Sequence, residues 1–124
     1  MEQPKDISCK TPRWFFLKAQ LNNLSPKDFQ KAWQESEDAV LIDVRTAEEF
    51  DIEHLPNALN ISYFDESLWD QMEQMDRSKS YFIYCRTGRR SIRVCTLMRN
   101  GGFDNDRLFN LDGGMVAWHE QLSD

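Results

Sequence analysis

Residues 84–91, with the sequence YCRTGRRS, place one cysteine, one glycine and three arginines within eight positions. The whole chain of 124 residues carries a formal net charge of −6, so this segment concentrates positive charge in an acidic protein. Neighbouring cations favour the ionised, nucleophilic form of a cysteine sulfur. The segment therefore predicts that Cys85 is a reactive thiol and that its surroundings attract an anion.

The residues on either side indicate how Cys85 is held. Residues 81–84 are an apolar run of strand length, and the apolar residues beyond the loop follow helical spacing: Ile92, Val94, Cys95, Leu97 and Met98. The N–H groups of a loop between a strand and a helix, together with the positive end of the helix dipole, can hold an anion. Gly88 allows such a loop to turn tightly.

We expect this cradle to keep Cys85 substantially ionised at neutral pH, where only a few per cent of a free thiol is ionised. The residues expected to bind the anionic substrate are Arg86, Thr87, Gly88, Arg89 and Arg90, although not all three arginines need point inward. The alternative is an inert cysteine buried at the end of a strand. The arginines and the glycine favour the reactive thiol.

Composition restricts the other functions that are open to the chain. Its acidic balance argues against binding to nucleic acid or to an anionic membrane surface. Cys9, Cys85 and Cys95 form neither a disulfide framework nor a metal-binding pattern, and free thiols are typical of a reducing compartment. The apolar run at residues 14–17 is too short for a signal peptide or a membrane span. We therefore expect a cytoplasmic protein without a metal site.

The rest of the chain alternates between expected strands and expected helices. Strands are predicted at residues 40–44, 57–61, 81–84 and 107–110. Ser25 with Pro26 is typical of a helix start, and Thr46 opens a second helix through a capping box with Glu49. Apolar spacing indicates one helix that carries Phe64, Leu68, Met72 and Met75, and another, after Gly113 and Gly114, that carries Val116, Trp118 and Leu122.

This alternation predicts a three-layer α/β fold, in which a parallel sheet of four or five strands has helices on both faces. Ligands of such sheets bind beyond the carboxyl ends of the strands. Asp43 and Cys85 both lie at expected strand ends of this kind. The fold therefore predicts that they meet at one site.

Four segments together resemble the single-domain rhodaneses, which are sulfurtransferases of the thiosulfate type. The loop YCRTGRRS is similar to the active-site loop of that family. LIDVRTAEEF at residues 41–50, EHLPNALNI at residues 53–61 and LDGGMVAWHE at residues 111–120 resemble three further family motifs, in the same order. The resemblance covers residues 41–120 and implies a rhodanese-like fold.

What the resemblance implies is a double displacement that needs no cofactor. The Cys85 thiolate would take a sulfur from a small anionic donor such as thiosulfate and form a persulfide. A thiophilic acceptor, such as cyanide, a cellular thiol or a protein, would then remove that sulfur. The N–H cradle would stabilise the negative charge of the persulfide. The sequence carries no indication of the oligomeric state.

Two other functions are compatible with the same fold. Related phosphatases and arsenate reductases use a loop one residue longer, with an arginine six positions after the cysteine. Here Ser91 occupies that position and the nearest arginine is Arg90, so the shorter loop favours sulfur transfer. Rhodanese-like domains also act as binding modules, often without the cysteine, and the presence of Cys85 argues against that function.

Several residues are expected to support the loop. The resemblance suggests that Asp43, Arg45 and Glu49 form a buried polar network beneath it. Ser91 is expected to cap the helix that follows. We expect His54 to be structural, since a thiolate that is ionised by its loop needs no general base. His119 is expected to be solvated.

Two positions depart from the family pattern, because Glu53 and Asn57 replace its glycines. Asparagine tolerates the left-handed conformation, so we expect Asn57 to keep the turn. The negative charge of Glu53 would weaken binding of the donor if it faced the site.

Residues 1–18 are expected to be an extension of a domain formed by residues 19–124. Pro4 and Pro12 discourage a long helix there, and residues 14–17 are expected to pack back on the domain. Nothing in the sequence places Cys9 near Cys85.

Overall fold

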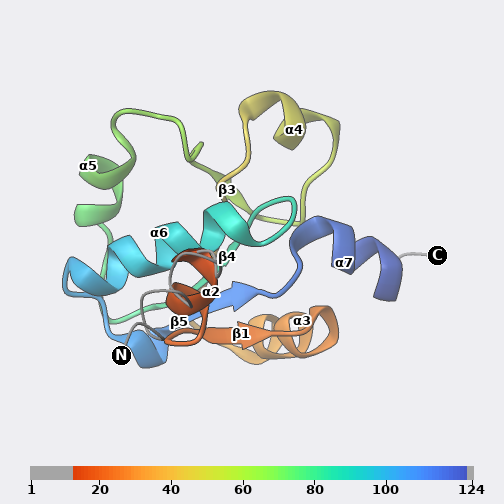
Figure 1. Ribbon diagram of the computed structural model, residues 1–124, viewed down its shortest axis with the longest axis horizontal. Helices are drawn as coiled ribbons and strands as arrows, with labels where there is room; N and C mark the ends of the chain where they lie inside the picture. The colour runs from red at the N-terminus through yellow and green to blue at the C-terminus, as the bar shows by residue number, and fades with distance from the viewer. Residues whose placement is uncertain (1–12, 123–124) are drawn as a thin grey trace, which may run out of the picture.

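A computed structural model describes residues 13–122 and shows a central sheet with helices on both faces (Figure 1). Five strands pair in parallel in the order β1-β5-β4-β2-β3. They are β1 (Asn22–Leu24), β2 (Ala39–Asp43), β3 (Leu59–Asn60), β4 (Ser80–Tyr84) and β5 (Leu108–Leu111). The predicted α/β class and the parallel sheet are confirmed.

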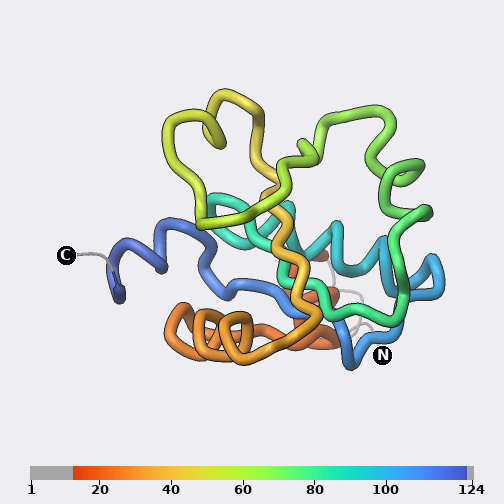
Figure 2. Tube along the Cα trace, turned by 180° about the vertical axis from the view of Figure 1, so that it is seen from behind, coloured from red at the N-terminus to blue at the C-terminus, as the bar shows by residue number. Residues whose placement is uncertain are grey.

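Helices cover both faces of the sheet and form the outer layers. They are α2 (Arg13–Lys18), α3 (Pro26–Glu35), α4 (Ala47–Ile52), α5 (Leu68–Glu73), α6 (Arg89–Asn100) and α7 (Gly114–Gln121), and a 3₁₀ turn lies at Asn105–Arg107. One core cluster packs α2, α5 and α6 on one face, and a second packs α3 and α7 on the other (Figures 1 and 2). Within residues 13–122, no helix is long and apolar enough to cross a bilayer.

The predicted helix starts at Ser25 and Thr46 are confirmed. The Ser25 Oγ accepts a hydrogen bond of 3.2 Å from the N–H of Asp28, and Pro26 takes the first helical position of α3. Thr46 and Glu49 exchange side-chain and backbone hydrogen bonds in a complete capping box at the start of α4. Both starts follow from local sequence alone, because the bonded groups are three residues apart.

Two predicted elements are shorter than expected. The helix expected from Phe64 begins only at Leu68, since the Asp65 carboxylate accepts a 2.8 Å hydrogen bond from the N–H of Ser67 and holds a turn there. Phe64 is consequently 67% exposed. The strand expected at residues 57–61 contains only Leu59–Asn60, because Asn57 has a φ of 66°. This left-handed backbone is the geometry expected for Asn57.

Strand β1 was not among the predicted strands. Its sequence, Asn-Asn-Leu, has little strand propensity, and it forms by pairing with β5, which lies far along the chain. The Asn22 side-chain amide secures it by donating hydrogen bonds to the carbonyl groups of Asn105, at 2.7 Å, and Leu108, at 3.1 Å.

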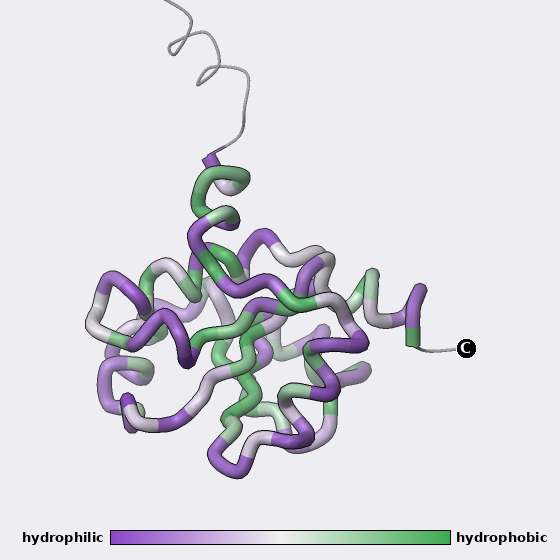
Figure 3. Tube along the Cα trace, turned by 90° about the horizontal axis from the view of Figure 1, so that it is seen from below, coloured by the Kyte–Doolittle hydropathy of each residue, from purple (hydrophilic) through white to green (hydrophobic). Residues whose placement is uncertain are grey.

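The six-residue helix α2 lies in the expected N-terminal extension. Trp14 and Leu17 pack against the core beside α6, whereas Phe15 and Phe16 are exposed. Figure 3 shows α2 as an apolar segment at the margin of the molecule, outside the apolar strands at its centre. The prediction for Cys9 concerns a residue outside the described range.

Candidate active site

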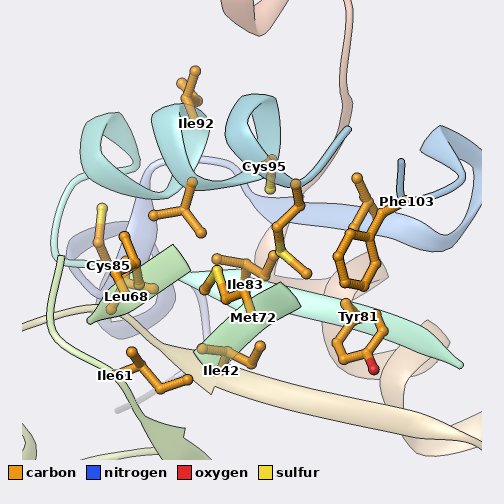
Figure 4. Close-up of a cluster of buried hydrophobic side chains, with 14 of the residues drawn as sticks. Ile42, Ile61, Leu68, Met72, Tyr81, Ile83, Cys85, Ile92, Cys95 and Phe103 are labelled. Atoms are coloured by element: carbon orange, nitrogen blue, oxygen red, sulfur yellow. The ribbon is translucent and has the colours of Figure 1, made fainter. Parts of the chain in front are cut away.

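Cys85 follows directly after β4, at the carboxyl end of the sheet. Its Sγ accepts hydrogen bonds from the N–H groups of Gly88, at 3.1 Å, and Ser91, at 3.4 Å. The side chain is fully buried at one end of the core cluster beneath α6 (Figure 4). Two backbone dipoles are therefore aimed at the sulfur, which has no exposed surface in this structure.

The loop has this orientation because its carbonyl groups are bound from the other side. The carbonyl oxygens of Cys85 and Arg86 accept hydrogen bonds from the N–H groups of Met115, at 2.9 Å, and Val116, at 3.0 Å, in the first turn of α7. Gly114 makes this contact possible, since it has a φ of +61° and a Cβ there would overlap both loop carbonyl groups. This contact fixes the first two peptide units of the loop against α7, while the two N–H groups that contact the sulfur come from Gly88 and Ser91 further along the loop.

The three loop arginines point in different directions. The Arg89 guanidinium lies 4.7 Å from the centre of the Trp14 ring. Arg90 lies 3.7 Å from a Glu49 carboxylate oxygen and 5.5 Å from the centre of the Phe64 ring. Arg86 lines a cavity and has no ion pair among the described residues. The arginines therefore do not converge on Cys85.

The larger of two cavities beside the loop has a volume of about 320 Å³ and lies between α4, the loop and α7. Its lining residues are Arg45, Glu49, Ile52, Glu53, Arg86, Met115, Val116 and His119. A second cavity of about 290 Å³ lies on the other flank of the loop and is lined by Trp14, Lys18, Thr87, Gly88, Arg89, Ile92, Asp112 and Gly113. Of the candidate substrate-binding residues, Arg86 lines the larger cavity and Thr87, Gly88 and Arg89 line the second, whereas Arg90 lines neither.

Asp43 and Arg45 form a buried ion pair at the end of β2. The Arg45 Nη2 lies 2.7 Å from an Asp43 carboxylate oxygen and also donates a hydrogen bond to the carbonyl of Glu53. Burial lowers the pKa of Arg45, but the hydrogen bond and the charge of Asp43 outweigh it and raise that pKa above its ordinary value. The pair therefore connects the end of β2 to the end of α4. Asp43 is also in register with Tyr84 of β4, and the Arg45 guanidinium lies over the Tyr84 ring.

Glu49 has a different position from the one expected within this network. Its carboxylate bonds to Thr46 and pairs with Arg90, and it has no hydrogen bond to Asp43 or Arg45 among the described residues. Partial burial raises the pKa of Glu49, but the Thr46 hydrogen bonds and the positive charge of Arg90 outweigh it and lower that pKa below its ordinary value. Glu49 therefore connects α4 to the loop arginine.

Ser91 belongs to a chain of buried hydrogen bonds that sequence reasoning missed. Its Oγ lies 3.5 Å from the Cys85 Sγ and donates a 2.6 Å hydrogen bond to Asn110 Oδ1. Asn110 Nδ2 in turn donates to Asn23 Oδ1 at 2.9 Å. The expected capping role of Ser91 is wrong, since Gly88 takes the N-cap position of α6.

Of the two histidines, only His119 joins Glu53 in lining the larger cavity. His54 stacks on Phe50 with ring centres 3.7 Å apart and does not line the cavity, so a structural role fits its position. His119 does line it, and its Nε2 lies 2.9 Å from a Glu53 carboxylate oxygen. This pair joins residues 66 positions apart, so no local sequence pattern predicts it.

Comparison with known proteins identifies the family. The family description "Rhodanese-like domain" matches residues 25–121, and the chain therefore belongs to the rhodanese family. YtwF of Bacillus subtilis, a proposed sulfurtransferase, is 33% identical over 99 residues, which cover 80% of this chain and 91% of YtwF. A sulfurtransferase of Allochromatium vinosum is 29% identical over 98 residues, which cover 79% of this chain and 88% of that protein.

A solved structure extends the similarity to nearly the whole chain. The polysulfide-sulfur transferase homodimer of Wolinella succinogenes superimposes with a TM-score of 0.73 at 29% identity and covers 98% of this chain and 88% of its own. The fold, the site and these relatives place the chain among the sulfurtransferases of the rhodanese family.

The contact of Gly114 with the loop can be tested by substitution. We expect Gly114→Ala to lower the free energy of unfolding by about 2–4 kcal/mol and to slow alkylation of Cys85, because the added methyl group pushes the loop off α7. Gly102→Ala is the matched control, since Gly102 has a φ of +104° but its Cβ would meet only the Arg77 side chain, at 3.7 Å. Equal alkylation rates in the two variants would contradict this role of Gly114.

The lowered pKa of Glu49 predicts a pH-dependent contribution to stability. Between the native and the unfolded pKa the unfolded chain binds more protons, so this contribution is present above the ordinary pKa and is lost as the pH falls through the native value. Urea unfolding between about pH 7 and pH 3 gives the free energy of unfolding of wild type and of Glu49→Gln. We expect the difference between the two free energies to shrink below about pH 4.3. A difference that stays constant over that range would contradict the lowered pKa of Glu49.

Proposed function

We propose that this protein moves a sulfane sulfur from an anionic donor such as thiosulfate to a thiophilic acceptor through a persulfide on Cys85. The observation that carries the proposal is the position of Cys85. It follows directly after a parallel strand, and its Sγ accepts hydrogen bonds from two backbone N–H groups. Such donors stabilise negative charge on sulfur without any reorganisation during the reaction.

The proposed reaction has two balanced steps. The Cys85 thiolate attacks the outer sulfur of thiosulfate, a new S–S bond forms, and the old S–S bond breaks with its electron pair leaving on sulfite. An acceptor thiolate or cyanide then attacks the terminal sulfur of the persulfide. The electron pair of the bond that breaks returns to the Cys85 Sγ, which regenerates the thiolate.

The charge of Arg86 supports an anionic donor and acts against the negative charge of Glu53, which lines the same cavity. Arg86 follows Cys85 in the sequence and lines the larger cavity, and its guanidinium group forms no ion pair with a described carboxylate. A guanidinium binds the oxygens of a sulfonate-type group through charge-assisted hydrogen bonds. Arg86 is accordingly the residue that we expect to contact the donor.

The position of Arg90 supports sulfur transfer over phosphate chemistry. A phosphatase needs an arginine that clamps the phosphate above the nucleophile. The Arg90 guanidinium instead pairs with the Glu49 carboxylate and lies over the Phe64 ring. The loop therefore has no arginine arranged for that clamp, in line with its shorter length.

Mass spectrometry of the protein after incubation with thiosulfate tests the proposal. We expect one additional sulfur on wild type and on Cys95→Ser, whose sulfur is buried in α6, and none on Cys85→Ser. Cyanide or a thiol should remove the adduct and restore the original mass. No adduct on wild type, together with cleavage of an aryl phosphate, would overturn the proposal and favour a phosphatase. No adduct with neither activity would favour a binding module.

A further inference from the structure

Glu53 brings a negative charge into the larger cavity, which lies beside the loop that carries Cys85. It stands at the C-cap of α4, where the resemblance to the family leads one to expect a glycine, and its side chain is 52% exposed. It lines the same cavity as Arg86. The cavity therefore contains charged groups of both signs.

The other charges of this cavity are already neutralised by ion pairs. Asp43 is paired with Arg45, and Arg90 lies 3.7 Å from Glu49. Among the described residues, the Glu53 carboxylate has only the imidazole of His119 as its partner, at 2.9 Å. An imidazole N–H can donate a hydrogen bond to a carboxylate without cancelling its charge. Glu53 and Arg86 are thus the two charges of the cavity that a ligand can still use.

The remaining wall of the cavity is apolar and its size is small. Ile52, Met115 and Val116 line it, and Ile52 is 86% exposed. A volume of about 320 Å³ is at the lower end of the range for small-molecule sites. A ligand with a short aliphatic body and a charged end fits these properties better than a large peptide does.

We propose that Glu53 selects the sulfur acceptor by charge and favours small thiols that carry an ammonium group. The inference rests on the proposed persulfide of Cys85 and concerns only its second step. The acceptor thiolate attacks the terminal sulfur, and the electron pair of the broken S–S bond returns to the Cys85 Sγ. An ammonium group on that acceptor is attracted by Glu53, whereas a carboxylate group on it is repelled. If the acceptor carries a carboxylate group as well as the ammonium group, the guanidinium of Arg86 attracts that carboxylate.

The selectivity can be measured on persulfide that has been formed beforehand. The protein is loaded with thiosulfate, the donor is removed, and loss of the extra sulfur is followed by quenching and mass spectrometry. The acceptors are cysteamine, 2-mercaptoethanol and 3-mercaptopropionate, compared at equal concentrations of thiolate. We expect wild type to prefer cysteamine over 3-mercaptopropionate, and Glu53→Gln to reduce that ratio of rates by about fivefold.

Matched variants separate a local from a general effect of charge. Glu53→Lys should reverse the preference, while 2-mercaptoethanol, which is uncharged apart from its thiolate, changes less than about twofold. Glu120→Gln and Glu120→Lys change the net charge by the same amounts next to His119, but outside the cavity, and should leave the ratio as in wild type. Added salt should reduce the preference of wild type, because exposed charges are screened.

The outcomes distinguish this inference from the function on which it rests. If wild type accepts sulfur from thiosulfate but Glu53→Gln keeps the wild-type ratio, the inference is wrong and the persulfide mechanism stands. An equal shift in the Glu120 variants would also overturn it. If wild type cannot be loaded, the proposed function itself fails.

Discussion

The binding of the Cys85 loop to the first turn of α7 is the interaction on which the site depends. The N–H groups of Met115 and Val116 fix the carbonyl groups of Cys85 and Arg86. A peptide unit that turns its carbonyl group outward turns its N–H group inward, so this contact sets the direction of the Arg86 and Thr87 N–H groups. It thereby fixes the start of the loop whose Gly88 and Ser91 N–H groups contact the sulfur. Gly114, the first residue of α7, matters because a side chain there would occupy the space of the loop backbone.

The site obtains its positive potential locally, within a protein whose formal net charge is −6. Backbone N–H groups contact the sulfur, while the arginines are distributed around the loop. Aromatic rings and Glu49 hold Arg89 and Arg90, which leaves Arg86 at the larger cavity. Fixed backbone dipoles therefore contact the sulfur, whereas a ligand in the larger cavity meets the guanidinium of Arg86 and the carboxylate of Glu53. This separation lets the binding preference of the cavity change without altering the nucleophile.

Features set by short-range bonding could be predicted from the sequence. The caps at Ser25 and Thr46, the left-handed Asn57 and the position of Cys85 at a strand end all depend on a few adjacent residues. Features that need distant partners could not. Strand β1 exists through its pairing with β5, and the chain from Ser91 to Asn23 through Asn110 joins three separate elements. The directions of the arginines likewise depend on Trp14 and Phe64, which no local pattern places beside them.

The state of the Cys85 sulfur at neutral pH is the most direct test of how the loop works. The ultraviolet absorbance of thiolate, measured as the difference between wild type and Cys85→Ser across the pH range, reports that state without requiring a reagent to enter the site. If the N–H groups of the loop stabilise the anion, the difference is already present at about pH 6 to 7. A difference that develops only above about pH 8, as in an ordinary free thiol, would contradict this mechanism.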